Sequence, residues 1–128
     1  MKKIFVLILF ISQLAFSQEE IEITKLLKEW KLETCERNGI VKTAEELERE
    51  NEFIVFYKNN KFKMKDEETT LNGIWKYNTK TRSLELNLIE LGHKINFKIV
   101  KLNDNELSYI HEELDNNMIF NLKPNIKK

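Results

Sequence analysis

The stretch FIVFYKNNKFKMKD, residues 53–66, decides the fold of this chain. Two strand-like runs, Phe53–Lys58 and Lys61–Asp66, are separated only by Asn59-Asn60. Within the second run apolar side chains alternate with lysines, which predicts one buried and one wetted face. Asparagine tolerates the left-handed backbone of a tight turn, so the stretch predicts a β-hairpin.

The same period of two recurs along the chain, and asparagine and aspartate clusters mark the turns between the runs. The predicted strands are Leu27–Glu36, Phe53–Lys58, Lys61–Asp66, Thr70–Asn78, Ser83–Ile89, Lys94–Leu102, Glu106–Glu112 and Asn117–Leu122. Alternation of this kind is typical of antiparallel sheets. It breaks at Ile99–Leu102, where we expect a bulge. A mainly β fold with eight strands follows, although a two-sheet sandwich would alternate in the same way as a barrel.

One segment between the first two predicted strands has a different character. Residues 43–50, TAEELERE, are rich in helix formers, and Thr43 followed by Glu46 fits a capping box. We therefore expect a short helical insert after the first strand, with a solvated acidic face. A second short amphipathic helix is expected over Ile21–Leu27.

The N-terminus has the pattern of an export signal. A basic start precedes the apolar run Ile4–Ile11, and small and polar residues follow as far as Ser17. This order predicts a signal peptide over residues 1–17, cleaved before Gln18. The apolar run is too short to span a bilayer. We expect a mature domain of residues 18–128, exported to the periplasm or secreted, without a stable membrane anchor because no cysteine stands at position 18.

Composition excludes several classes of function. Without Lys2 and Lys3 the chain has 19 basic and 21 acidic side chains, so electrostatics give no support to nucleic-acid binding. Cys35 is the single cysteine, so no internal disulfide can form. We expect its side chain to be buried. Three glycines and one proline provide no linker, so a single domain is predicted. The sequence does not specify an oligomeric state.

No catalytic or metal-binding motif is present. The two histidines are His93, expected in an exposed turn, and His111, expected to face inward near one end of a strand. The run HEELD at residues 111–115 has aspartate where a zinc-protease helix needs its second histidine. We therefore predict a protein that is not an enzyme, with no catalytic residues, no metal and no cofactor.

Three short motifs carry a resemblance to a known family: LLKEWKL at 26–32, GIWKY at 73–77 and SLELNL at 83–88. On these residues the chain resembles the small lipocalin-like domains of secreted Bacteroidetes-type proteins. The resemblance implies an eight-stranded, antiparallel, up-and-down lipocalin-like β-barrel. It also implies a small apolar ligand held inside the barrel.

Candidate ligand-binding residues are bulky side chains that we expect to face the interior. They are Trp30, Phe62, Met64, Trp75, Tyr77 and Leu86. The two tryptophans could line a cavity or plug the barrel, with their ring N–H groups hydrogen-bonded. An eight-stranded barrel is just wide enough to be filled by side chains or to hold one small ligand. Because the inward-facing residues are large, a small or absent cavity is predicted.

A filled barrel leads to an alternative function. The protein would then be a protein-interaction or cell-envelope structural module that acts through its outer surface or through the insert Gly39–Asn51. Candidates for an exposed apolar patch are Ile40, Val41 and Ile54.

Overall fold

The protein is an antiparallel β-barrel, seen in a computed structural model that describes residues 22–111 and 115–125. The predicted signal peptide lies outside the described residues. The nine strands of the sheet are β1 (Glu29–Arg37), β2 (Ile40–Thr43), β3 (Phe53–Phe56), β4 (Lys61–Lys65), β5 (Thr70–Asn78), β6 (Ser83–Leu88), β7 (His93–Leu102), β8 (Leu107–His111) and β9 (Asp115–Pro124). A single 3₁₀ turn, η1 (Ile89–Leu91), connects β6 to β7.

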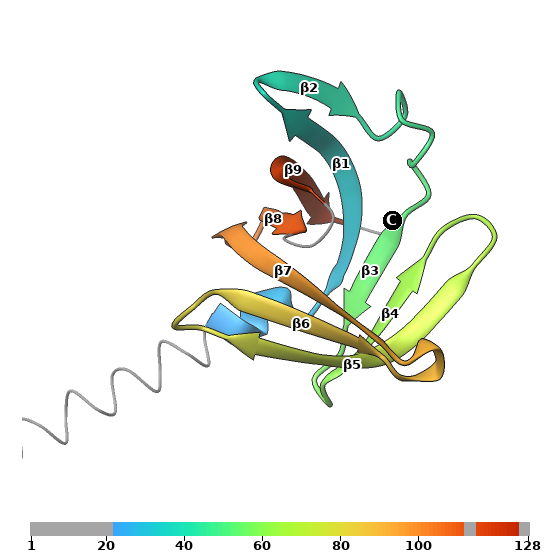
Figure 1. Ribbon diagram of the computed structural model, residues 1–128, viewed down its shortest axis with the longest axis vertical. Coiled ribbons are helices and arrows are strands. Elements are labelled where there is room, and N and C mark those ends of the chain that lie inside the picture. The colour runs from blue at the N-terminus through green and yellow to red at the C-terminus, as the bar shows by residue number, and fades with distance from the viewer. Residues whose placement is uncertain (1–21, 112–114, 126–128) are drawn as a thin grey trace, which may run out of the picture.

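Eight of these strands close the barrel. From β3 to β9 each strand pairs with the next in sequence, and β1 pairs with both β3 and β9 (Figure 1). The predicted eight-stranded, up-and-down barrel is therefore confirmed, and the sandwich is excluded. The eight predicted strands agree with the observed ones to within two residues at each end, and β5 has the predicted bounds.

Register shifts interrupt three of the described strand pairings; one lies between Ile110 and His111 of β8, and the other two lie beside core residues. The bulge expected in β7 is confirmed by a register shift between Ile99 and Lys101. A second shift, between Leu32 and Thr34 of β1, was not predicted. It allows both Leu32 and Cys35 to be buried, so the cysteine is in the core as expected.

Strand β2 is an addition to the predicted set. It pairs only with the second half of β1, and this hairpin extends beyond the rest of the barrel (Figure 1). Asn38 and Gly39 connect the two strands with φ of 52° and 80°, which are the left-handed angles of a two-residue type I′ turn. All four residues of β2 are exposed.

The expected helical insert is a single helical turn that follows β2. The Leu47 amide donates to the Thr43 carbonyl at 3.2 Å, which is the spacing of one α-helical turn. The predicted capping box is present, since the Glu46 amide donates to Thr43 Oγ1 at 3.1 Å. Glu48 then adopts a left-handed φ of 56°, which ends the helical turn and prevents a longer helix.

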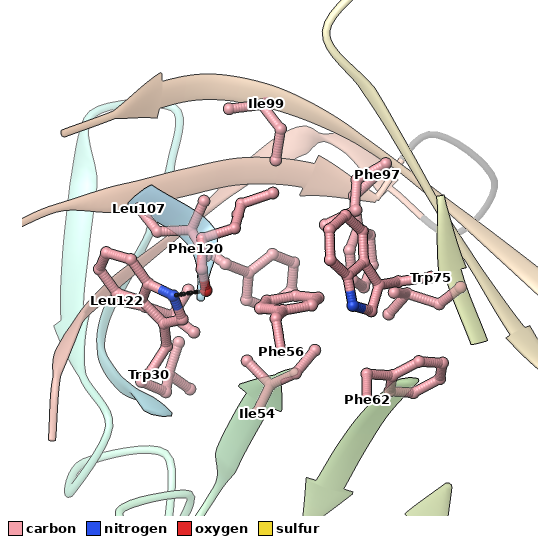
Figure 2. Packing of buried hydrophobic residues seen from close by; sticks show 14 of the residues in the cluster. Trp30, Ile54, Phe56, Phe62, Trp75, Phe97, Ile99, Leu107, Phe120 and Leu122 are labelled. Atoms are coloured by element: carbon pink, nitrogen blue, oxygen red, sulfur yellow. Dashed lines mark hydrogen bonds between the residues drawn. The ribbon is translucent and has the colours of Figure 1, made fainter. Parts of the chain in front are cut away.

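A short helical segment closes one end of the barrel. Residues 22–26 are helical, in agreement with the helix expected there, and Leu26 is fully buried. The Trp30 indole N–H donates to the Leu26 carbonyl oxygen at 3.1 Å (Figure 2). The Tyr77 hydroxyl donates to the Glu22 carboxylate at 2.9 Å. We call this the closed end, and the opposite end, beside β2, the open end.

The core fills the space that the eight strands enclose. Side chains from all of these strands converge on one interior (Figure 2). Gly73 is required by this packing, because Phe62 of β4 lies directly opposite it. A Cβ at Gly73 would stand 2.7 Å from the Phe62 ring and would clash with the Asn87 carbonyl oxygen.

Candidate functional site

The six predicted ligand-binding residues belong to the packed core. Trp30, Phe62, Trp75 and Leu86 are at most 3% exposed, whereas Met64 and Tyr77 are partly buried. The Trp75 indole N–H donates to the Tyr57 carbonyl at 3.1 Å, and the indole of Trp30 is bonded in the same manner. Hydrogen bonds of this kind are expected of tryptophans that plug a barrel. The binding role of the six side chains stays a prediction.

Three stacked aromatic rings, those of Phe97, Tyr109 and Phe120, lie in the part of the interior that faces the open end. Tyr109 stacks on Phe97 with 4.1 Å between ring centroids and on Phe120 with 5.4 Å. The Arg49 guanidinium lies 5.3 Å from the Phe120 ring and pairs with the Glu52 carboxylate. We call Arg49 and Glu52 the throat pair. The hollow beneath it has a volume of about 20 Å³, room for a single water.

A larger hollow lies at the open end, in front of the β1–β2 hairpin. It has a volume of about 250 Å³ and is lined by Cys35, Arg37, Asn38, Ile40, Lys42, Leu47 and Met118. We call it the mouth hollow. Cα pairing places Lys42 opposite the buried Cys35, and both Ile40 and Met118 opposite Arg37. Because residues opposite one another share a face, the hollow continues the inner surface of the barrel.

The mouth hollow has an apolar floor and a cationic rim. Its floor is formed by Leu47 and Met118, which pack against the core, and by Cys35, which is only 4% exposed. Arg37 and Lys42 are exposed at the rim. Lys42 forms no ion pair with any residue in the described part of the chain. The hollow is therefore suited to a small molecule with an apolar body and a negative end.

Cys35 lies in the core and is only 4% exposed. Burial raises its pKa, an effect that the nearby Arg49 charge partly opposes. A protonated thiol is a weak nucleophile and a weak metal ligand. His93 is exposed at the start of β7, and the His111 ring packs edge-on against Phe97. Within residues 22–111 and 115–125, no three His, Cys, Asp or Glu side chains form a group that could hold a metal ion.

Sequence reasoning did not find the mouth hollow, although one signal pointed to it. Asn38-Gly39 is the preferred dipeptide of a two-residue hairpin, and it marks where β2 begins. Recognition of that turn would have placed Lys42 opposite Cys35. The throat pair gives no comparable signal, because Arg49 and Glu52 follow the helical turn on irregular backbone.

Comparison with known proteins identifies the type of fold to which this barrel belongs. No protein-family profile matches the chain, and no curated protein matches its sequence. A lipocalin-like protein from Bacteroides uniformis superposes with a TM-score of 0.63 at 15% identity, covering 79% of this chain and 99% of the other. The fold is lipocalin-like. A DUF4847 family protein from Bacteroides vulgatus matches this lipocalin-like barrel with a TM-score of 0.61 at 12% identity, covering 84% and 99%.

The two matches confirm the fold that the resemblance implied, a lipocalin-like domain as found in Bacteroides proteins. Identities of 12–15% establish the architecture alone. In the described part of the lipocalin-like chain, no helix has the length and apolar character needed to cross a membrane.

Proposed function

We propose that this lipocalin-like barrel is an exported, non-enzymatic protein that binds a small amphipathic anion in the mouth hollow. The observation that carries the proposal is the inner face of the β1–β2 hairpin, where an apolar floor meets a cationic rim outside a filled core. A volume of about 250 Å³ lies just below the usual range of ligand pockets, about 300–1,000 Å³, which favours a compact ligand.

The lining residues divide the recognition between two ends of the ligand. An acyl chain would cover Leu47, Met118 and Ile40, the last of which is 65% exposed without a ligand. Burial of such apolar surface contributes about 25 cal/mol per Å². A carboxylate at the rim would then reach the ammonium group of Lys42, for which no ion-pair partner exists among the described residues.

Isothermal titration calorimetry with decanoate, below its micelle concentration, tests this site. We expect Ile40→Asp to abolish measurable binding and Lys42→Glu to weaken it about tenfold, because each places a negative charge beside the ligand. Lys98→Glu, on the exposed face of β7, is the matched control and should bind as the wild type does. Decanol should bind more weakly than decanoate.

Two results would count against the proposal. One is the absence of decanoate binding to the wild-type protein, and the other is binding that Ile40→Asp and Lys42→Glu leave unchanged. Native mass spectrometry of protein purified from its own host extends the test to natural ligands. N-terminal sequencing of that material tests export, since a mature chain that begins at Gln18 is expected.

The filled interior also supports the alternative of an interaction or envelope module. Of its candidate surface residues, Ile40 and Val41 are 65% and 55% exposed, but Ile54 is 4% exposed and belongs to the core. The correction follows from the register of β3, in which Ile54 lies opposite Trp30 on the inner face. Crosslinking from β2 in the host envelope, with Val41→Asp as the comparison, tests this module.

A further inference from the structure

A second concave surface lies on the outside of the barrel, separate from the mouth hollow. It is a trough of about 430 Å³ along β3 and β4, lined by Glu29, Phe53, Val55, Tyr57, Lys63, Lys65 and Asn125. We call it the outer trough. The floor is apolar although it faces solvent, and Tyr57 is 45% exposed.

The register of the hairpin gives the outer trough a regular pattern. Phe53 pairs with Lys65 and Val55 with Lys63, while the Tyr57 amide donates to the Lys61 carbonyl at 2.8 Å. Phe53 and Val55 of β3, and Tyr57 directly after it, therefore each lie beside a lysine of β4. A row of apolar side chains on the floor of the trough thus runs parallel to a row of lysines.

Some lysines of the barrel are held in ion pairs, whereas others, such as the exposed Lys76, Lys80 and Lys98, form none with the residues that the structure describes. Lys94, Lys101 and Lys123 each pair with a carboxylate, those of Glu85, Glu106 and Glu33. By contrast, Lys61, Lys63 and Lys65 form no ion pair with any residue that the structure describes. Close to the same floor, the Lys31 ammonium lies 5.8 Å from the Phe53 ring centroid. Glu29 brings one carboxylate to the outer trough, opposite Val55, where it accepts a hydrogen bond from the Asn125 side-chain amide. The lysine charges outnumber this carboxylate and are available to a bound anion.

Two features of the outer trough, its concave shape and the fully paired backbone of β3 and β4, restrict the kind of partner that could bind there. A flat bilayer cannot fill a trough. An extended peptide would leave its own amides unpaired, because β3 and β4 are both hydrogen-bonded to neighbours on each side. Pyranose rings have apolar faces that pack on aromatic side chains, and sugar acids provide the charge for lysines. We propose that the outer trough binds a short acidic oligosaccharide.

The extent of the apolar row, which runs beside the lysines, sets the length of this ligand. Phe53 to Tyr57 spans about 14 Å at about 3.4 Å per residue, enough for roughly three sugar units. Beyond Lys65 the chain continues with Asp66, Glu67 and Glu68, whose negative charges would repel a longer acidic chain. The outer trough and the mouth hollow share no lining residue, so this inference is independent of the function proposed above.

Calorimetric titration with trigalacturonate, and with the uncharged galactose trimer as comparison, tests the inference. We expect the acidic trimer to bind and the neutral trimer to bind at least tenfold more weakly. Lys63→Gln with Lys65→Gln should reduce affinity for the acidic trimer at least tenfold, and Tyr57→Ala should reduce it as well. Lys80→Gln with Lys98→Gln, which removes the same charge from exposed sites elsewhere, should have no effect.

The proposal is overturned if the acidic trimer does not bind, or if the two double variants behave alike. It is also overturned if a short oligothymidylate or a vesicle containing anionic phospholipid binds as tightly as the trimer and loses affinity in Lys63→Gln/Lys65→Gln. Thermal unfolding of each variant confirms that the barrel is intact, which is expected because the substituted lysines lie on its outer face.

Discussion

The Trp30 indole N–H and the Leu26 carbonyl oxygen lie 3.1 Å apart at the closed end, and both side chains are completely buried. This bond holds the helical segment 22–26 against the first strand of the barrel. The tryptophan thereby fills the interior and satisfies a carbonyl group at the end of a short helix.

Trp30→Ala should lower the free energy of unfolding by about 3–5 kcal/mol, because it removes a large buried side chain and leaves a cavity. Trp30→Phe keeps much of the volume but loses the hydrogen bond, and we expect a loss of about 1–2 kcal/mol. Urea denaturation measures both changes, with the exposed Lys98→Ala as control. An unchanged midpoint for Trp30→Ala would contradict the plug interpretation.

Gly73→Ala should destabilise the barrel by about 1–3 kcal/mol through overpacking, since the new methyl group would meet the Phe62 ring and the Asn87 carbonyl. Asn72→Ala, one residue earlier on the exposed face, should change the unfolding free energy by less than about 0.5 kcal/mol. Thermal denaturation compares the two variants. Equal melting temperatures would show that the contact between Gly73 and Phe62 is looser than described.

Stability should fall as the pH rises from 10 to 12. Burial, together with the hydrogen bond to Glu22, raises the pKa of Tyr77 from 10.0 to about 12. Between these values the unfolded chain has lost the phenolic proton while the folded protein keeps it. The stabilisation is therefore complete below pH 10 and is lost through this window.

Tyr77→Phe isolates this contribution. Burial also raises the pKa of Tyr109, so the variant should show a smaller loss of stability with pH than the wild type, rather than none. Urea midpoints measured at pH 9, 10.5 and 12 give the comparison. Identical pH profiles for Tyr77→Phe and the wild type would exclude a raised pKa at this residue.

The Cys35 thiol should react slowly with a thiolate-specific reagent at pH 8, because burial raises its pKa and covers the sulfur. Leu47→Ala should accelerate the reaction, since Leu47 lines the same hollow and packs on the core. Ile89→Ala, an exposed site on η1, is the control. Rapid labelling of the wild-type protein under native conditions would place the thiol at the surface.

The barrel could be predicted because its information is local. Alternation along each strand, as in Ser83–Leu88, identifies the buried face, and paired asparagines identify the turns. The bulge near Ile99 was predicted for the same reason, as a break in a pattern. Strand β2 was missed because its four residues are all exposed and show no alternation.

The candidate site could not be predicted in the same way. Trp30, Phe62, Trp75 and Leu86 were correctly expected to face inward, but whether inward residues surround a cavity depends on how closely they pack across the barrel. That packing involves partners such as Phe56 and Trp75, whose rings meet edge-to-face at 5.9 Å. The mouth hollow likewise depends on the β1–β2 hairpin extending past the barrel, a tertiary feature.

The pairing of β1 with β9, from Trp30 opposite Pro124 to Arg37 opposite Met118, has a consequence for biosynthesis. The first of the described strands, β1, needs as a neighbour the last of them to be made, β9. Until the segment that ends at Pro124 is in place, β1 keeps an unpaired edge that invites association with other unfolded chains. Completion of the cylinder therefore depends on contacts between distant parts of the sequence, and contacts of this kind slow folding in general.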